Sequence, residues 1–431
     1  MEKQLRGKKL LMLGTSMATL DIIKYARSEG VYVIFTDNID PALSPGKKLA
    51  DEYWNISTDD IETLEKLSLE NKVNGVFAGV SEFNLKNAMM LCDRLYLPFY
   101  CSSEQWSALS EKHSFKALCR KFDIPVVEET VFDGEIARGR LEKFRYPVII
   151  KPVDGSGGDG VRVCHNINEV IAAWPGAMNF SKSKKILLEP YVPGLELTVF
   201  YAIQNGKIIL TGMSDRYTRH KHGNIIPVPV AHVMPSVYQS KYLHEIDNKA
   251  KAMFESLSLQ NGIIFIQAFA NNGNIMFYEM GYRLTGTQEY HILEHECGLN
   301  TMKMMVNYAL TGEMSDLDIS TNINPNYSQY YCLINFLVKP GTIGQMIGTE
   351  EAAAYPEVIN TVYEHRPGDT VTESALGTLR QIAFRVFAKA PTMHELARVM
   401  DKIHNTVKII SDRGDNMLLP PLNINELQYE A

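Results

Sequence analysis

A glycine-rich stretch after a lysine is the first place in this sequence where residue types suggest chemistry. The segment VIIKPVDGSGGDG puts Lys151 at the end of an apolar run, followed by Gly155, Ser156, Gly157, Gly158 and Gly160. Glycines let several backbone N–H groups converge on one anion, so a phosphate chain is the expected guest. The stretch is not a P-loop, because no Lys-Ser/Thr pair follows the last glycine. We predict a phosphate-covering loop with Lys151 at its mouth; a glycine hairpin without a ligand is the structural alternative.

The elements that must position this loop begin with an α/β pattern in the first hundred residues. KKLLMLG, VYVIFTD and NGVFAGV have the composition of strands, and helix-like segments separate them. This alternation predicts a parallel sheet with helices on its faces. Gly14 and Asp37 suggest a nucleotide fold, but GTSMAT lacks the G-x-G-x-x-G pattern. We favour a structural α/β domain that forms one wall of a site.

Antiparallel architecture is expected further along the chain. Asn205-Gly206 lies between two apolar runs and predicts a hairpin, and NNGN at 271–274 predicts a second one. The expected fold class is therefore a multidomain α/β and α+β protein. Its parts are predicted as an N-terminal α/β domain (1–107), a central domain (108–324) and a C-terminal mixed α/β domain (325–431).

Composition narrows the class of protein. The chain has 43 basic and 50 acidic residues, a net charge of −7, and no block of like charges, which argues against nucleic acid or an anionic membrane as partner. No window offers eighteen uninterrupted apolar residues, so we expect no membrane span. The 6 cysteines are scattered without metal-site spacing, as is typical of reduced thiols in a cytoplasmic protein.

The motifs taken in order resemble the ATP-grasp superfamily, in particular its carboxylate–amine ligases and the related biotin carboxylase and carbamoyl phosphate synthetase folds. Lys112 in SEKHSFK and Lys151 in VIIKP match the two ATP lysines of the family, and DGSGGDGV matches its phosphate-covering loop. The resemblance implies that the central domain consists of two α+β subdomains, one of them a lid at about 125–190.

The segment LLEPYVPGLELTV resembles the hinge of the family. The resemblance implies that Glu189 and the backbone of Tyr191 and Val192 contact the edge of adenine. It also implies that Glu196 binds the ribose hydroxyls.

The segment FYEMGYRLTG resembles the metal-binding strand, but with two departures. Family members hold Mg²⁺ with two carboxylates twelve residues apart and an asparagine two residues beyond the second. Here Glu279 keeps the second carboxylate, whereas Gln267 and Gly281 occupy the other two positions. We predict ATP with one well-held Mg²⁺ and a weaker or absent second ion, with Mn²⁺ as an alternative metal. Arg283 matches the arginine that contacts the transferred phosphate; a surface ion pair is its structural alternative.

Substrate recognition is the least defined part of the resemblance. Arg216 is a candidate carboxylate clamp, with a solvated basic loop as the alternative, and His232 is a candidate cleft residue, with a core role as the alternative. The implied activity is an ATP-dependent carboxylate–amine ligase of EC 6.3 type that forms an acyl phosphate from small-molecule substrates. A carboxyphosphate-type carboxylase and a nucleotide-binding protein with impaired turnover stay open, as does a homodimer.

Overall fold

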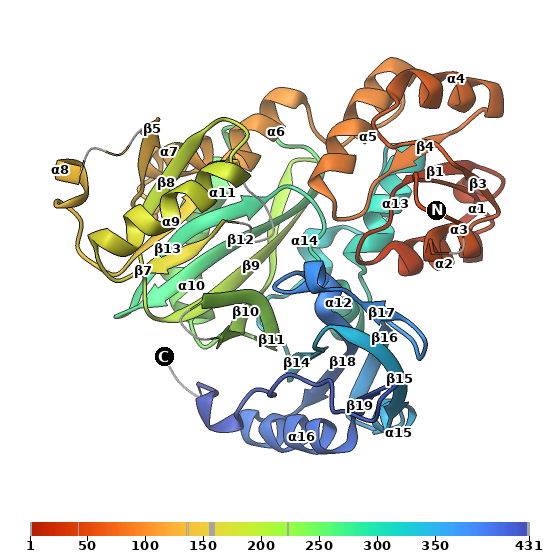
Figure 1. The fold of residues 1–431 in the computed structure, drawn as a ribbon. Coiled ribbons are helices and arrows are strands. Elements are labelled where there is room, and N and C mark those ends of the chain that lie inside the picture. The colour runs from red at the N-terminus through yellow and green to blue at the C-terminus, as the bar shows by residue number, and fades with distance from the viewer. Residues whose placement is uncertain are drawn as a thin grey trace.

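The computed structural model describes residues 2–428 except 42, 135, 137, 155–159, 222 and 223. Its elements form a multidomain α/β and α+β architecture, so the predicted fold class is confirmed. Figure 1 shows the N-terminal part on the right, the lid on the left beside the central sheet, and the C-terminal part below. Among the described residues, no helix combines the length and the apolar character that crossing a membrane requires.

The N-terminal part is the predicted parallel sheet, with strand order β3-β2-β1-β4. Its strands are β1 (Lys9–Leu13), β2 (Tyr32–Thr36), β3 (Glu52–Trp54) and β4 (Gly75–Phe77). Its helices are α1 (Glu2–Leu5), α2 (Thr19–Ser28), α3 (Pro45–Leu49), α4 (Ile61–Asn71) and α5 (Glu82–Leu95). The side chains of Asp60 and Ser81 cap α4 and α5 by accepting backbone N–H groups, which fixes where these helices begin.

The lid, residues 130–190, is a four-stranded antiparallel sheet with a hydrophobic core of its own. Its elements are β5 (Thr130–Asp133), α8 (Arg138–Leu141), β6 (Val148–Pro152), β7 (Arg162–Cys164), α9 (Ile167–Phe180) and β8 (Lys185–Pro190). Phe132 and Trp174 meet edge to face between the sheet and α9. Because these apolar side chains pack among themselves, the lid is a distinct packing unit.

An eight-stranded sheet forms the centre of the molecule, in the order β13-β12-β9-β10-β11-β14-β18-β16. Its central strands are β9 (Leu195–Gln204), β10 (Lys207–Lys221), β11 (Asn224–Met234), β12 (Gly262–Asn271) and β13 (Asn274–Gly281). Both predicted hairpins are present, β9–β10 and β12–β13, with Asn205-Gly206 and Asn272-Gly273 in left-handed backbone conformations.

Helices of the central part cover this sheet and join it to the N-terminal part. They are α6 (Ser103–Ser110), α7 (Lys112–Lys121), α10 (Gln239–Glu245), α11 (Asp247–Glu255), α12 (Tyr290–Cys297), α13 (Thr301–Thr311) and α14 (Ile319–Asn322).

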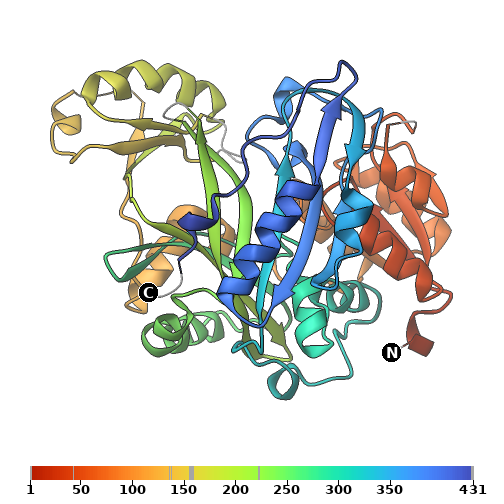
Figure 2. The same ribbon diagram turned by 90° about the horizontal axis from the view of Figure 1, so that it is seen from below.

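The C-terminal part continues the central sheet. Strands β14 (Tyr330–Leu337), β18 (Ile382–Ala390) and β16 (Val358–Tyr363) extend it beyond β11, and Figure 2 shows these blue strands beside the green central ones. The remaining strands and α-helices that the structure describes here are β15 (Gly341–Ile347), α15 (Thr349–Ala353), β17 (Thr370–Val371), α16 (Met393–Thr406) and β19 (Lys408–Ser411). The boundary at 324/325 thus falls between strands of one sheet, and the domain limits remain a proposal.

Candidate functional site

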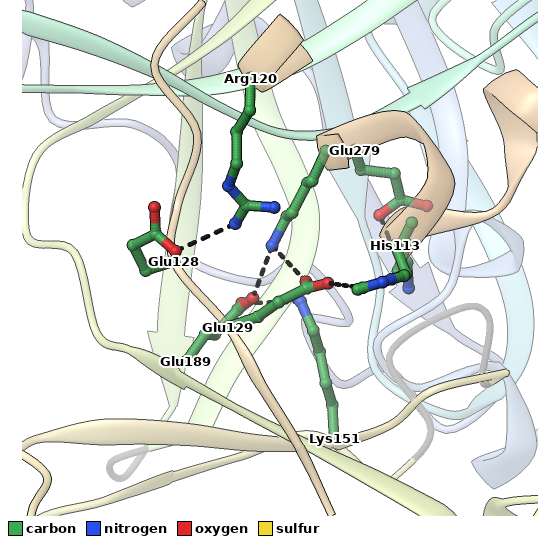
Figure 3. A network of polar contacts seen from close by, with 9 residues as sticks. His113, Arg120, Glu128, Glu129, Lys151, Glu189 and Glu279 are labelled. Carbon is green, nitrogen blue, oxygen red and sulfur yellow. Dashed lines mark hydrogen bonds and ion pairs between the residues drawn. The ribbon is translucent and has the colours of Figure 1, made fainter. Parts of the chain in front are cut away.

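Three lysines converge where α7, the lid and the central sheet meet. Lys112 and Lys116 lie one helical turn apart on α7, and Lys151 projects from β6 of the lid. Lys151 Nζ donates to Glu189 Oε1 at 2.7 Å, and Lys116 Nζ lies 3.5 Å from Glu189 Oε2. Figure 3 shows Lys151, Glu189 and Glu129 directed toward one another. The carboxylate of Glu189 therefore joins the lid to α7.

Lys116 and Glu129 form the deepest pair of this cluster. Lys116 Nζ donates to Glu129 Oε2 at 2.6 Å, and their side chains are 1% and 3% exposed. Burial raises the pKa of Glu189, but the nearby charges of Lys151 and Lys116 outweigh burial, so this pKa lies below its ordinary value. Sequence reasoning missed Lys116 and Glu129; the spacing of Lys112 and Lys116 was the available signal.

Glu279 faces this cluster from the central sheet. Its Oε2 lies 4.0 Å from Lys112 Nζ, and its side chain is 38% exposed. Gln267 is directly opposite Glu279 in the β12–β13 register, in line with the family resemblance. Lys112, Gln267 and Glu279 thus come together from three separate segments.

Gly281 has a steric reason to lack a side chain. It pairs with Phe265 across β12 and β13, and a Cβ atom at 281 would lie 2.3 Å from the Phe265 ring. An asparagine at 281 therefore requires the ring to move. The described residues contain no group of three His, Cys, Asp or Glu side chains able to hold a metal ion.

Arg283 packs against the same aromatic ring. Its guanidinium carbon lies 4.8 Å from the centre of the Phe265 ring, a cation–π contact. Nη2 donates to Glu82 Oε1 of α5 at 3.0 Å, and Nη1 donates to the Leu284 carbonyl at 2.9 Å. The ion pair considered for Arg283 therefore exists, and it connects the segment after β13 to the N-terminal part.

A cavity of about 150 Å³ lies beside the hinge, with Tyr191, Val192, Glu196, Arg216 and Phe269 among its lining residues. Glu196 accepts hydrogen bonds from Arg216, from Thr218 at 3.1 Å and from Tyr278 at 3.4 Å. The Arg216 side chain is 10% exposed, so it does not belong to a solvated loop, and it lies at Glu196 inside the cavity.

His232 is a buried residue of β11, opposite Arg216 in the β10–β11 register. Its Nδ1 lies 3.0 Å from Ser214 Oγ. Burial and the charges of Arg216 and Arg385 hold the pKa of His232 well below the ordinary value, so the ring is neutral. This environment matches the core role more than that of a cleft residue.

The glycine-rich loop can be placed only at its end. Gly155, Ser156, Gly157 and Gly158 lie outside the described residues, whereas Gly160 has φ +73° and an added Cβ would lie 3.0 Å from Pro152.

In the N-terminal part, Asp37 forms a 2.7 Å ion pair with the buried Lys47. That carboxylate is engaged within its own domain, which agrees with the structural interpretation of the first α/β unit.

A lid facing a large antiparallel sheet, with lysines and a carboxylate between them, defines the ATP-grasp class of protein. Residues 111–317 match the family model of the carbamoyl-phosphate synthase L chain, ATP binding domain. This part of the chain belongs to the ATP-grasp superfamily, as the sequence motifs indicated.

Known relatives are similar at low identity. The carbamoyl phosphate synthase large chain of Agathobacter rectalis is 24% identical over 61% of this chain, but the match spans only 24% of that relative's length. The L-amino acid ligase of Bacillus licheniformis superposes with a TM-score of 0.76 at 16% identity, covering 94% of this chain and 99% of the ligase. The biotin carboxylase domain of Hydrogenobacter thermophilus 2-oxoglutarate carboxylase, in complex with MgADP, ADP and bicarbonate, also gives 0.76, at 17% identity over 95% and 91%. These structures share the fold.

Proposed function

We propose that this protein is an ATP-dependent ligase that joins a carboxylate to an amine. The observation that carries the proposal is the cluster between the lid and the central sheet, where Lys112 lies beside Glu279 and Lys151 pairs with Glu189. The L-amino acid ligase that superposes over nearly the whole chain supports the amine as acceptor.

The proposed reaction has two steps. A carboxylate oxygen of the substrate takes the γ-phosphoryl group of ATP, which gives ADP and an acyl phosphate. The amine nitrogen then attacks the carbonyl carbon, the C–O bond to phosphate breaks, and the amine proton is lost as the amide forms. Such chemistry depends mainly on alignment and charge neutralisation.

The described residues suit the binding of a nucleotide in this cleft. Tyr191 and Val192 offer the backbone of the hinge to adenine, and Glu196 faces the same cavity as the proposed ribose ligand. Lys112 and Lys151 supply positive charge for the phosphates, and Arg283 would reach the transferred group on leaving Glu82. Closure of the lid over these groups would exclude water.

The residues present fit one Mg²⁺. Glu279 offers a half-exposed carboxylate and Gln267 an amide oxygen on the opposite strand. Phosphate oxygens and waters usually complete the shell of this ion. When bound, the ion would neutralise charge on the phosphates. Gly281 offers no ligand, and the Phe265 ring occupies the adjacent space.

A nucleotide-binding protein with low turnover is the second candidate, and the Gly281–Phe265 contact favours it. The amide of Gln267 in place of a carboxylate also weakens the proposed metal site.

The test is release of ADP and phosphate by the purified chain, with ATP, Mg²⁺ and a panel of amino acids, and separately with bicarbonate. We expect turnover that depends on an amino-acid pair and is abolished in Lys151→Ala. Lys121→Ala, an exposed lysine on α7, is the matched control. Turnover that depends on bicarbonate alone would support the carboxylase alternative. Calorimetric ATP binding without hydrolysis under every mixture would support the second candidate, and equal turnover in Lys151→Ala would refute the ligase proposal.

A further inference from the structure

A buried arginine of the C-terminal part holds the loop that follows Arg283. Arg385 on β18 is 0% exposed. Its Nη1 donates to the Gly286 carbonyl at 2.6 Å and to Gln288 Oε1 at 2.7 Å, and its Nε donates to Asn335 Oδ1 at 2.8 Å. One guanidinium thus connects the loop to the C-terminal end of the central sheet.

These three acceptors are neutral oxygens, so burying the charged guanidinium among them costs free energy. Taking a cation out of water carries a large desolvation penalty, and a contacting carboxylate normally offsets part of it. The acidic groups that favour the charged form of Arg385, led by Glu364 and including Asp21 and Glu289, act through longer-range attraction. An apolar side chain would fill the site at a lower desolvation cost, so the guanidinium is best explained by the loop geometry that it specifies.

The loop held by Arg385 has little freedom of its own. Gln288 has φ +58°, a left-handed conformation that strains a residue with a side chain. Its side-chain nitrogen Nε2 donates to Oδ2 of Asp21, a residue of α2, at 3.3 Å. A Cβ atom at Gly286 would lie 2.4 Å from Leu379 Cδ1 and 3.7 Å from Met17 Cγ. The N-terminal and C-terminal parts therefore fix this loop from both sides.

The loop begins at the arginine that we place at the transferred phosphate. Arg283 Nη1 donates to the Leu284 carbonyl, two residues before Gly286, whose carbonyl accepts from Arg385. We propose that Arg385 is a positioning residue that fixes loop 284–289 and, through it, the orientation of Arg283. The effect of Arg385 on catalysis rests on the proposed function, whereas its effect on the placement of the loop does not.

The experiment compares Arg385→Met with Lys389→Met, which makes a similar change four residues along the same strand. Backbone hydrogen exchange of residues 284–289 is measured by mass spectrometry on the full chain, together with kcat, KM and calorimetric Kd for ATP. In Arg385→Met we expect exchange in this loop to rise by about tenfold or more while exchange in β12 stays unchanged. We expect kcat to fall by about 10- to 100-fold with the Kd for ATP within about threefold. Lys389→Met should leave all these quantities near the wild type.

Unchanged exchange in loop 284–289, or a uniform rise over the whole central sheet, would overturn the inference. A parallel loss of ATP affinity would also overturn it, because Arg385 would then support the sheet as a whole. If Arg385→Met does not fold, Gln288→Ala removes one acceptor and is subject to the same criteria. Failure of the proposed function is recognised separately, as absent turnover in the wild type, and the exchange measurement still decides the placement of the loop.

Discussion

Replacement of Lys116 by methionine tests whether the buried charge cluster stabilises the junction of α7 and the lid. Lys116 Nζ lies 2.6 Å from Glu129 Oε2 and 3.5 Å from Glu189 Oε2. At an effective dielectric constant of about 20, these distances correspond to attractions of about 6 and about 5 kcal/mol before desolvation is subtracted. Glu189 keeps Lys151 as a partner, whereas among the described residues Glu129 keeps only His113, at 3.4 Å.

The expected loss in the free energy of unfolding is about 3–5 kcal/mol, the usual result of leaving one buried charge uncompensated. Adding Glu129→Gln removes that charge, so the double variant should recover at least about 1.5 kcal/mol of the loss. Lys121→Met, an exposed position on the same helix, should change stability by less than about 0.5 kcal/mol.

The assay is urea unfolding followed by Trp106 fluorescence, with Trp54 and Trp174 replaced by phenylalanine. The 3 tryptophans lie in different parts of the chain, and Trp106 is buried in α6, which packs on α7. A loss below about 1 kcal/mol in Lys116→Met, as for an exposed ion pair, would refute the reasoning. Additive losses in the double variant would refute it as well, because they would show no coupling between Lys116 and Glu129.

Two further predictions concern the central sheet. Gly281→Asn should lower the free energy of unfolding by about 1–3 kcal/mol, because its Cβ would lie 2.3 Å from the Phe265 ring. Combining it with Phe265→Ala should cost less than the sum of the two single losses in urea unfolding, and strict additivity would contradict the steric argument. The pKa of folded His232 lies well below 6.5, so the unfolded chain binds more protons beneath that pH. The contribution of neutral His232 to the free energy of unfolding is therefore intact above pH 6.5. It decreases as the pH falls, by up to about 1.4 kcal/mol per pH unit. The unfolding free energies of the wild type and His232→Gln, measured from pH 7.5 to about pH 5.5, should therefore approach each other as the pH falls. Parallel curves would disprove the lowered pKa of folded His232.

Much of the local structure follows from the sequence, because local structure depends on short-range periodicity and turn chemistry. The alternation of apolar strands and helices predicted the parallel N-terminal sheet, and Asn205-Gly206 predicted the β9–β10 hairpin. The family resemblance assigned Gln267 and Glu279 to the two metal-ligand positions, and the structure pairs them on neighbouring strands. The family resemblance was also readable, because its motifs are short and ordered along the chain.

Contacts between distant segments were decided only by the tertiary structure. No local pattern in the sequence indicates that β11 pairs with β14. The continuation of the central sheet into the C-terminal part was therefore not predicted. Lys116 is an ordinary helix residue until the fold places Glu129 and Glu189 beside it. Gly281 could be recognised as a departure from the family, but the reason for it, the Phe265 ring on the adjacent strand, depends on packing. Arg385 acquires its role in the same way, because its acceptors come from a loop about a hundred residues earlier and from a neighbouring strand.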